Sequence, residues 1–252
     1  MTVTMQYDAL APIYDRLMSH VEYEEWVDLI KRVVARYGNS RFPRIFELGA
    51  GTGVLGSTLV KMGYSYIGSD LSLPMCHQAH SIRNLPVCTA DARFLPVKTK
   101  FDLVLFLYDG INYLRTVDDF AVLFQSVAKM LSPGGLFLFD ITTEANSLRH
   151  FSEYLDFEDY GDFSFVRHSY YDDNTCIQHN DFTIYKQSDE NPRLFEKFKE
   201  RHRQRVYPVS AIEQVIPAEH FNILGIWDGY SFKRYSPRSE RIHFLLRKSG
   251  PR

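Results

Sequence analysis

An apolar run that ends in a carboxylate leads directly into closely spaced glycines, in RIFELGAGTGVLG at residues 44–56. The run 44–48 has the length of a buried strand. Glycines let the chain turn sharply and let a ligand approach the backbone. Nucleotides bind at such turns, at the carboxyl ends of parallel strands in open α/β sheets. The stretch therefore predicts a strand, a ligand-binding turn and a helix, and it constrains the fold more than any other feature.

Short apolar runs alternate with helical patterns over residues 21–141. Runs of strand length occur at 44–48, 64–69, 85–90, 101–108 and 136–141. Apolar residues at helical spacing occur at 21–37, 54–62, 73–82 and 117–131. Strands that alternate with helices form βαβ units around a parallel sheet. Residues 132–135, Ser-Pro-Gly-Gly, supply a reversal before the fifth strand, because proline stops a helix and glycine accepts positive φ.

The pattern changes after residue 143. Residues 160–207 have the pattern of strands joined by hairpins, with turn residues at 172–174 and 188–192. A helical pattern at 209–219 and apolar runs at 221–228 and 242–247 follow. We therefore predict one α/β domain over residues 1–252, with a Rossmann-like, seven-stranded, mostly parallel sheet. An antiparallel β lobe, inserted after the fifth strand, is expected at about 145–207.

Composition limits the classes of partner. The net charge of −2 argues against broad electrostatic binding to nucleic acid or to an anionic membrane. No apolar run approaches the roughly 20 residues of a membrane span. Cys76, Cys88 and Cys176 match no metal-binding spacing, and an odd number argues against a disulfide framework. We expect a cytoplasmic protein without a metal site, and the sequence leaves monomer and homodimer open.

Three ligands compete for the glycine turn. A phosphate-binding P-loop needs lysine and a hydroxyl residue after its last glycine, whereas Val54 and Leu55 follow Gly53. A dinucleotide fingerprint can be read from Gly51 to Gly56, but it begins two residues late. S-adenosylmethionine carries a sulfonium and an amino group in place of phosphate. Glu47 suits that cationic end and would repel a pyrophosphate, so the residues favour the third ligand.

Two aspartates follow the next strands. Asp70 ends the second predicted strand, where a carboxylate can accept hydrogen bonds from both ribose hydroxyls. Asp91 follows the third, placed to accept from an adenine amino group. Each aspartate also suits the N-cap of a helix. Because Asp70, Asp91 and Glu47 stand at the carboxyl ends of successive strands, we expect them to face one crevice.

These motifs resemble those of the class I S-adenosylmethionine-dependent methyltransferases. The likeness is carried by FELGAGTG at 46–53, GSD at 68–70, ADA at 90–92 and FDLVL at 101–105. The segments 7–15 and 108–113 are similar to those of a small-molecule branch that includes deoxysugar N-methyltransferases, which carry an antiparallel insertion after strand five. The resemblance implies S-adenosyl-L-methionine as cofactor and a small acceptor methylated on nitrogen or oxygen. It implies a cofactor site formed by Tyr14, Glu47, Gly49, Ala50, Gly51, Gly53, Asp70, Leu71, Met75, Asp91 and Ala92.

Acceptor contacts are expected in the loop after strand four. Candidates are Tyr108, Asp109, Asn112 and Tyr113, although asparagine and aspartate also shape turns and tyrosine also packs. A catalytic base is not assigned. Histidines that could serve are His150, His168, His179 and His202.

A row of cations at alternate positions leaves other functions open. If residues 195–207 form a strand, one face carries Lys197, Lys199, Arg201, Arg203 and Arg205. Such a face could hold an anion or a nucleic-acid backbone, or it could be a solvated edge guarded by charge. The alternatives are therefore an RNA or protein methyltransferase that docks through this strand, a non-catalytic S-adenosylmethionine-binding protein, and an NAD-dependent oxidoreductase.

Overall fold

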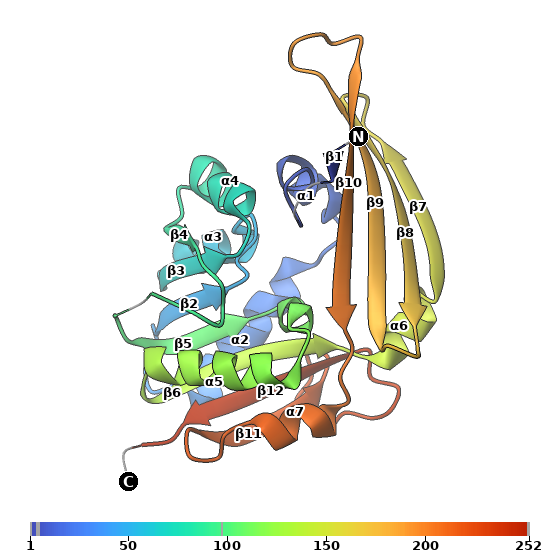
Figure 1. Cartoon of the computed structure of the whole chain (residues 1–252). Helices are drawn as coiled ribbons and strands as arrows, with labels where there is room; N and C mark the ends of the chain where they lie inside the picture. The colour runs from blue at the N-terminus through green and yellow to red at the C-terminus, as the bar shows by residue number, and fades with distance from the viewer. Residues whose placement is uncertain (1, 4–5, 97, 251–252) are drawn as a thin grey trace.

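A seven-stranded sheet forms the larger part of the molecule. The computed structural model describes residues 2–3, 6–96 and 98–250 (Figure 1). The sheet has the strand order β11-β12-β6-β5-β2-β3-β4. Its strands are β2 (Arg44–Leu48), β3 (Ser65–Asp70), β4 (Val87–Thr89), β5 (Phe101–Phe106), β6 (Leu131–Thr142), β11 (Phe221–Asp228) and β12 (Arg241–Lys248). The five strands from β2 to β6 run parallel, whereas β12 is antiparallel to both neighbours. This is the predicted mostly parallel sheet, and its strand order reverses beside β2.

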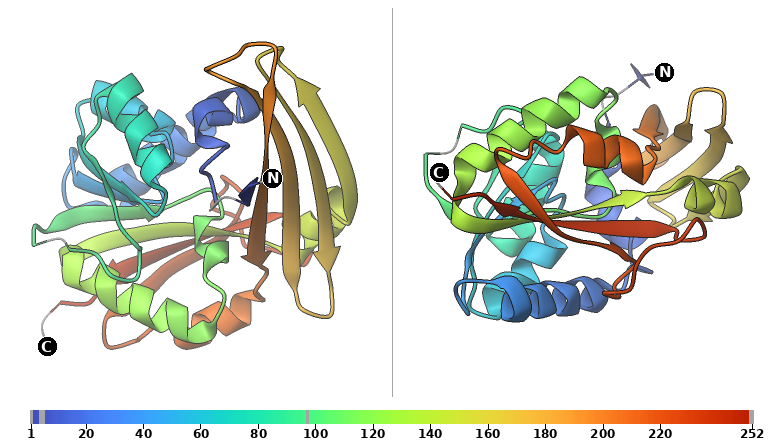
Figure 2. Two further views of the ribbon diagram at one scale, coloured as in Figure 1. Left: turned by 45° about the horizontal axis from the view of Figure 1, so that its top comes forward. Right: turned by 90° about the horizontal axis from the view of Figure 1, so that it is seen from below.

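Helices cover both faces of this sheet (Figure 2). They are α2 (Tyr23–Tyr37), α3 (Val54–Lys61), α4 (Leu73–Arg83), α5 (Val117–Met130) and α7 (Val209–Val215). Alternate residues of the buried strands point to opposite sides, so Ile45 packs with α2 and α3 while Phe46 packs with α5 and α7. Thr116 and Asp119 form a capping box at the start of α5, which fixes where that helix begins.

Two boundaries differ from the predictions for physical reasons. The helix predicted over 209–219 ends at Val215, because Pro217 follows and disfavours helical backbone before it. The Ser-Pro-Gly-Gly reversal lies inside β6 as a bulge, since Phe101 pairs with Leu131 and Leu103 already pairs with Leu136.

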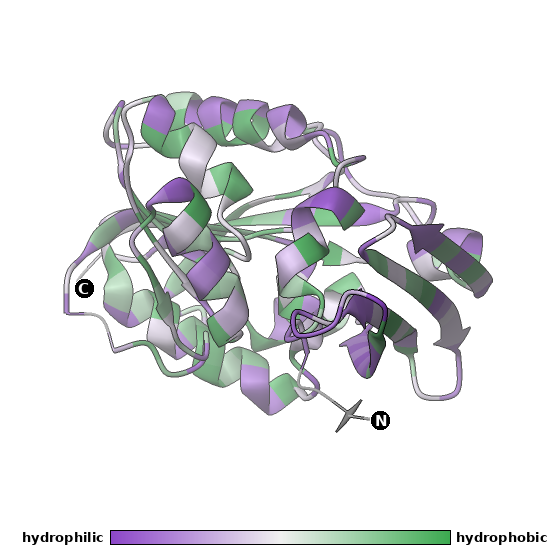
Figure 3. Cartoon of the chain, turned by 90° about the horizontal axis from the view of Figure 1, so that it is seen from above, coloured by the Kyte–Doolittle hydropathy of each residue, from purple (hydrophilic) through white to green (hydrophobic). Residues whose placement is uncertain are grey.

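A second sheet forms the inserted lobe. Its strands are β7 (Glu153–Asp159), β8 (Phe163–Asp172), β9 (Ile177–Gln187) and β10 (Phe195–Arg205), which pair antiparallel in that order. The predicted turns at 172–174 and 188–192 join β8 to β9 and β9 to β10. The short strand β1 (Thr2–Val3) adds to β10 in parallel, which the sequence did not predict. Hydrophilic and hydrophobic residues alternate along the lobe strands, as expected for a sheet with two different faces (Figure 3). The division into one domain with a lobe at about 145–207 stays a prediction.

The N-terminal segment, residues 6–21, lies between the two sheets and connects them (Figures 1 and 2). It contains η1 (Ala11–Ile13) and α1 (Tyr14–Leu17). On one side, the Asp15 carboxylate accepts hydrogen bonds from Thr52 Oγ1 and Arg83 Nη2, each at 2.5 Å. On the other side, Leu10 and Ile13 pack against lobe residues such as Phe165. We call these residues the strap, because they bridge the glycine turn and the lobe.

None of the helices within the described ranges combines the length and the hydropathy of a membrane-spanning segment.

Candidate active site

The glycine turn lies where the strand order of the sheet reverses. Gly49, Gly51 and Gly53 all have positive φ, at 64°, 56° and 82°. A Cβ at Gly53 would lie 2.6 Å from Leu85 Cδ1, so both the backbone conformation and the packing require glycine there. Ala50 N donates to Ser69 O at 2.9 Å and fixes the turn against β3. The result is a sharp bend at the carboxyl end of β2, in which Gly49 is exposed while Thr52 and Gly53 are buried.

Glu47 lies beneath this turn and is only 5% exposed. Its Oε2 accepts a hydrogen bond of 2.5 Å from the Tyr66 hydroxyl. Burial raises the pKa of Glu47 to about 8, although the Tyr66 hydrogen bond opposes the shift. The carboxyl group is therefore mostly protonated at pH 7.

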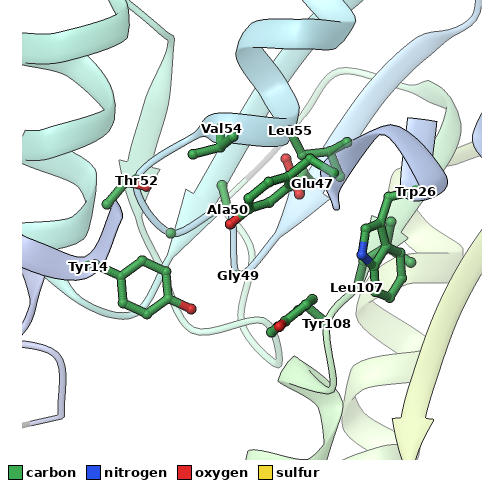
Figure 4. Close-up of a pocket in the computed structure, with 12 residues that line it drawn as sticks. Tyr14, Trp26, Glu47, Gly49, Ala50, Thr52, Val54, Leu55, Leu107 and Tyr108 are labelled. Atoms are coloured by element: carbon green, nitrogen blue, oxygen red, sulfur yellow. The ribbon is translucent and has the colours of Figure 1, made fainter. Parts of the chain in front are cut away.

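A small cavity of about 60 Å³ opens beside Glu47 and the turn (Figure 4). It is lined by Tyr14, Tyr23, Trp26, Glu47, Gly49, Ala50, Gly51, Thr52, Val54, Leu55, Leu107 and Tyr108. Tyr14 comes from the strap and Tyr108 from the loop after β5, and in Figure 4 both rings project into the space facing Gly49. The sequence predicted Trp26 only as an apolar residue of a helix. Its place in the cavity lining was not predicted, because tertiary packing alone brings the indole ring there.

Asp70 is tied directly to the turn. Its Oδ2 accepts from Gly51 N at 2.8 Å, and its Oδ1 accepts from Ser72 N at 2.9 Å. Burial raises the pKa of Asp70, against the lowering effect of these backbone donors. Leu71, beside it, is 62% exposed, whereas Met75 is buried in the first turn of α4. Neither of the two cavities described here is lined by Asp70, Leu71 or Met75.

Asp91 has a different environment. Its Oδ2 lies 2.6 Å from Nη2 of Arg93, and the same guanidinium lies 2.5 Å from Asp119. The hydrogen bond from Arg93 holds the pKa of Asp91 below its usual value. Ala92 packs against the core of the α5 face. The structure thus brings Glu47 and Asp70 to the glycine turn, while Asp91 is bonded to α5 through Arg93.

A larger cavity of about 620 Å³ lies between the carboxyl edge of the seven-stranded sheet and the lobe. It is lined by Tyr7, Leu10, Tyr14, Leu17, Met18, His20, Tyr108, Asp109, Tyr113, Thr142, Asn146, His150, Phe151, Tyr154, Arg167, Gln178, Asn180, Phe182, His202, Gln204 and Arg241. Tyr14 and Tyr108 line both cavities, so the two spaces meet at these rings. The chain therefore offers two adjoining compartments, one at the glycine turn and one under the lobe.

The loop after β5 is held in a sparsely populated conformation. Tyr108 and Asp109 have φ of 61° and 51°, in the left-handed region. Arg241 Nη2 donates to Asp109 Oδ1 at 2.9 Å and also pairs with Asp140. Asp140 in turn accepts from Asp109 N at 2.9 Å. Burial raises the pKa of Asp109, whereas Arg241 lowers it. This buried network fixes the strained loop at the junction of the two cavities.

Asn112 and Tyr113, both predicted as acceptor contacts, have different environments in the structure. Asn112 is fully buried, and its amide bonds to backbone only: it donates to Arg205 O at 2.9 Å and accepts from Thr142 N at 3.0 Å. It shapes the loop, the alternative role that the sequence left open, and it does not line either described cavity. Tyr113 lines the large cavity.

The four candidate histidines also differ in whether they reach the large cavity. His202 is 2% exposed and lines the large cavity from β10. His150 lines the rim and pairs with Glu240 at 3.0 Å. His168 and His179 are absent from both linings.

The row of cations forms the other face of β10. Lys197, Lys199, Arg201, Arg203 and Arg205 alternate with Phe198, Glu200, His202 and Gln204. The second set faces inward, and His202 and Gln204 reach the large cavity. None of the five cations lines either described cavity. Arg203 pairs with Asp181 at 2.6 Å on the neighbouring strand. The row is therefore an outward face, as the strand interpretation predicted.

Comparisons with known proteins agree with this geometry. Residues 45–135 match a family described as "Methyltransferase domain". A putative methyltransferase of Bacillus subtilis, YqeM, is 29% identical over 97% of this chain and 98% of its own length. The crystal structure of an S-adenosylmethionine-dependent methyltransferase from Clostridium acetobutylicum has a TM-score of 0.79, with 27% identity over 97% of this chain and 99% of that one. The sugar N-methyltransferase KedS8 from Streptoalloteichus has a TM-score of 0.76, with 18% identity over 100% of this chain and 98% of that one. The chain is therefore an S-adenosylmethionine-dependent methyltransferase with the class I fold.

Proposed function

We propose that this enzyme methylates nitrogen or oxygen of a small molecule bound in the large cavity. The observation that carries the proposal is the junction of the two cavities at Tyr14 and Tyr108. A volume of about 620 Å³ lies in the range of small-molecule sites. The strap and the lobe sheet contribute lining residues from both sides, which suits an enclosed acceptor better than an extended macromolecule.

The residues around the glycine turn fit S-adenosylmethionine. A Cβ at Gly49 would lie 3.1 Å from the Phe106 ring, so bare backbone is needed for the turn that approaches the ligand. Glu47, whose pKa is raised by burial, would ionise beside the cofactor's ammonium group. Asp70 would accept hydrogen bonds from the ribose hydroxyls, and Leu71 and Met75 would flank the adenine or the ribose. Asp91 would accept from the adenine amino group, with Ala92 and Ala50 completing the wall.

The cofactor supplies a methyl group already activated by the positive charge on sulfur. The chain's own residues have to orient the acceptor and exclude water. Tyr14 and Tyr108 frame the junction at which the methyl group would be transferred, and Tyr14 belongs to the strap. Burial raises the pKa of both phenols, so they stay neutral at this junction. Asp109 and Tyr113 are the proposed acceptor contacts beside Tyr108. Asn112 is left out because its amide is fully engaged with backbone.

The related structures support a polar acceptor. KedS8 is described as a sugar N-methyltransferase. The inner face of the lobe presents carboxamides to the cavity here, namely Gln178, Asn180 and Gln204. Such groups both donate and accept hydrogen bonds, as hydroxyl- or amine-bearing acceptors require.

An RNA or protein substrate is the weaker alternative. The cationic row would have to bind it, and that row is on the outward face of β10, with the large cavity on the inner side. We further propose a cytoplasmic enzyme, as the sequence suggests.

The test is methyl transfer from S-adenosylmethionine labelled in its methyl group. The enzyme is incubated separately with low-molecular-mass metabolites, total RNA and total protein from a bacterial extract. We expect label in the metabolite fraction, and loss of this label with Asp70→Ala. Label confined to RNA or protein would contradict the proposal, and loss of that label on replacing Arg201, Arg203 and Arg205 with alanine would establish the alternative. S-adenosylmethionine binding with no transfer to any fraction would indicate a non-catalytic protein.

A further inference from the structure

Four side chains form a continuous hydrogen-bonded chain that ends at the large cavity. The Tyr7 and Tyr113 hydroxyls lie 2.6 Å apart. The Tyr113 hydroxyl lies 3.1 Å from Nδ1 of His202. Nε2 of His202 lies 3.1 Å from Oε2 of Glu200. We call this set the relay. Tyr7, Tyr113 and His202 line the cavity, while Glu200 lies behind them.

Glu200 is fully buried, yet its carboxylate is well satisfied. Oε1 accepts from the backbone N–H groups of Ala9 at 2.5 Å and Leu10 at 3.1 Å. Oε2 accepts from Tyr7 N at 2.8 Å as well as facing His202. Several donors around one buried carboxylate offset the cost of removing its charge from water. The same contacts hold the strap against the lobe, so the relay is complete only with the strap in place.

The carboxylate determines which nitrogen of His202 carries the proton. Glu200 can only accept, so neutral His202 presents Nε2–H to it and an unprotonated Nδ1 to Tyr113. Two aromatic rings also face the imidazole. The ring centroid of Tyr7, in the strap, lies 4.5 Å from that of His202, and the ring centroid of Phe182, in β9, lies 5.5 Å from it. The His202 backbone carbonyl accepts from Arg203, whose guanidinium also pairs with Asp181. Glu200 is therefore the carboxylate that faces the ring.

The two tyrosine hydroxyls can pass a proton from one neighbour to another, but neither is expected to remain deprotonated. Burial raises the pKa of Tyr113, although the hydrogen bond to Tyr7 opposes this, and the nearby Asp109 charge raises it further. A phenol with a raised pKa stays neutral at rest. It can take a proton on its oxygen only while giving its own proton to a neighbouring base, and that neighbour is Nδ1 of His202.

We propose that His202 is the base of the methyl transfer, reached through Tyr113, and that the acceptor carries a proton on the atom that is methylated. This inference rests on the proposed function. The acceptor's lone pair forms the bond to the methyl carbon as the sulfur–methyl bond breaks. The acceptor's proton passes to the Tyr113 oxygen while the Tyr113 proton passes to Nδ1. The positive charge thus leaves sulfur and appears on the imidazolium beside Glu200. Tyr113 is a catalytic residue in this scheme, whereas Glu200 positions His202.

The first test does not need the acceptor. Histidine is labelled with nitrogen-15 in the full chain, which is then saturated with S-adenosylhomocysteine, and His202→Asn identifies the His202 signals. We expect a neutral ring with its proton on Nε2 at pH 8. We expect Tyr113→Phe to shift the Nδ1 signal and Glu200→Gln to shift the Nε2 signal. Tyr185→Phe, on the outer face of the lobe, is the matched control and should change neither.

A proton on Nδ1 of the neutral ring would overturn the inference. An unchanged Nε2 signal in Glu200→Gln would also overturn it. If Glu200→Gln does not fold, because it loosens the strap, Tyr113→Phe still decides the matter, since it leaves every backbone contact of the strap intact.

The second test uses the metabolite fraction that accepts the methyl group. We expect Tyr113→Phe and His202→Asn to lower the turnover number at least tenfold with unchanged affinity for S-adenosylmethionine. The wild-type rate should fall at low pH, where the imidazole is protonated, and His202→Asn should remove this dependence. Absence of transfer to every fraction refutes the proposed function. Normal turnover and an unchanged pH profile in both variants refute the relay alone.

Discussion

Glu47 is expected to lose a proton when S-adenosylmethionine binds. The carboxyl group is buried under the glycine turn, and burial raises its pKa to about 8. At pH 7 such a group is about 90% protonated, so complete ionisation beside the cofactor's ammonium releases about 0.9 proton. At pH 9 the same group is about 10% protonated and the release should fall to about 0.1 proton. Glu47→Gln removes the titration but keeps an oxygen for the Tyr66 hydroxyl. It should weaken binding by about 1.5–3 kcal/mol, the usual contribution of a hydrogen bond to a charged group.

The assay is calorimetric titration with S-adenosylmethionine in two buffers of different ionisation enthalpy. The difference between the two heats gives the number of protons released, and Glu47→Gln is the matched control because Asp70 and other groups stay in place. Wild type should release close to one proton more than the variant at pH 7. Equal proton release by the two proteins would refute the role given to Glu47, as would full affinity in the variant.

Three further outcomes are expected from single substitutions. Gly53→Ala should lower the free energy of unfolding in urea by more than Gly63→Ala, since both glycines have positive φ but only Gly53 would place a Cβ 2.6 Å from a neighbour; equal losses would argue against close packing at the turn. Asp15→Asn should weaken the contact to Arg83 by about 1 kcal/mol and so raise the rate of amide hydrogen exchange in the strap about fivefold. Exchange in the seven-stranded sheet should not change. Unchanged exchange in the strap would show that Asp15 does not hold it. Burial lowers the pKa of His243 to about 3, so the folded chain keeps it neutral while the unfolded chain protonates below about pH 6.5. The free energy of unfolding should therefore decrease as the pH is lowered below about 6.5, by about 2 kcal/mol from this residue at pH 5. His243→Leu should remove that part of the pH dependence. An identical pH dependence in the variant would place the titration elsewhere.

The strands and helices of the larger sheet were predictable because their signals are local. The run 44–48 and the glycines each act within a few residues, and β2, α3 and α4 lie within a residue or two of their predicted bounds. The link between Asp70 and the turn was also predictable, because adjacent parallel strands end at one edge of a sheet. The hairpins of the lobe followed from their turn residues.

The acceptor side was harder to predict because it is assembled from distant segments. Arg241 opens the last strand, and only antiparallel pairing of β12 with β6 brings it beside Asp140. The alternation along β10 was visible in the sequence, but the cations drew attention to the outward face. Glu200 and Gln204 could have been found as the polar residues between them, at the positions that turn inward.

Asn112 shows the limit of a residue type as evidence. An asparagine in a loop beside a cofactor site fits a ligand contact and a turn equally well. Its amide instead joins the loop to β6 and β10 by backbone bonds that only the fold can bring within reach.

The central claim is that the glycine turn and Asp70 hold S-adenosylmethionine and not a dinucleotide. It is tested most directly by calorimetric titration of wild type, Asp70→Ala and Asp70→Asn with S-adenosylmethionine and with NAD. The account predicts that wild type binds S-adenosylmethionine and shows no heat with NAD. It also predicts that both substitutions weaken binding at least tenfold, about 1.4 kcal/mol, as the charged acceptor for the ribose hydroxyls is lost. Unchanged affinity in both variants, or NAD binding by the wild type, would contradict it.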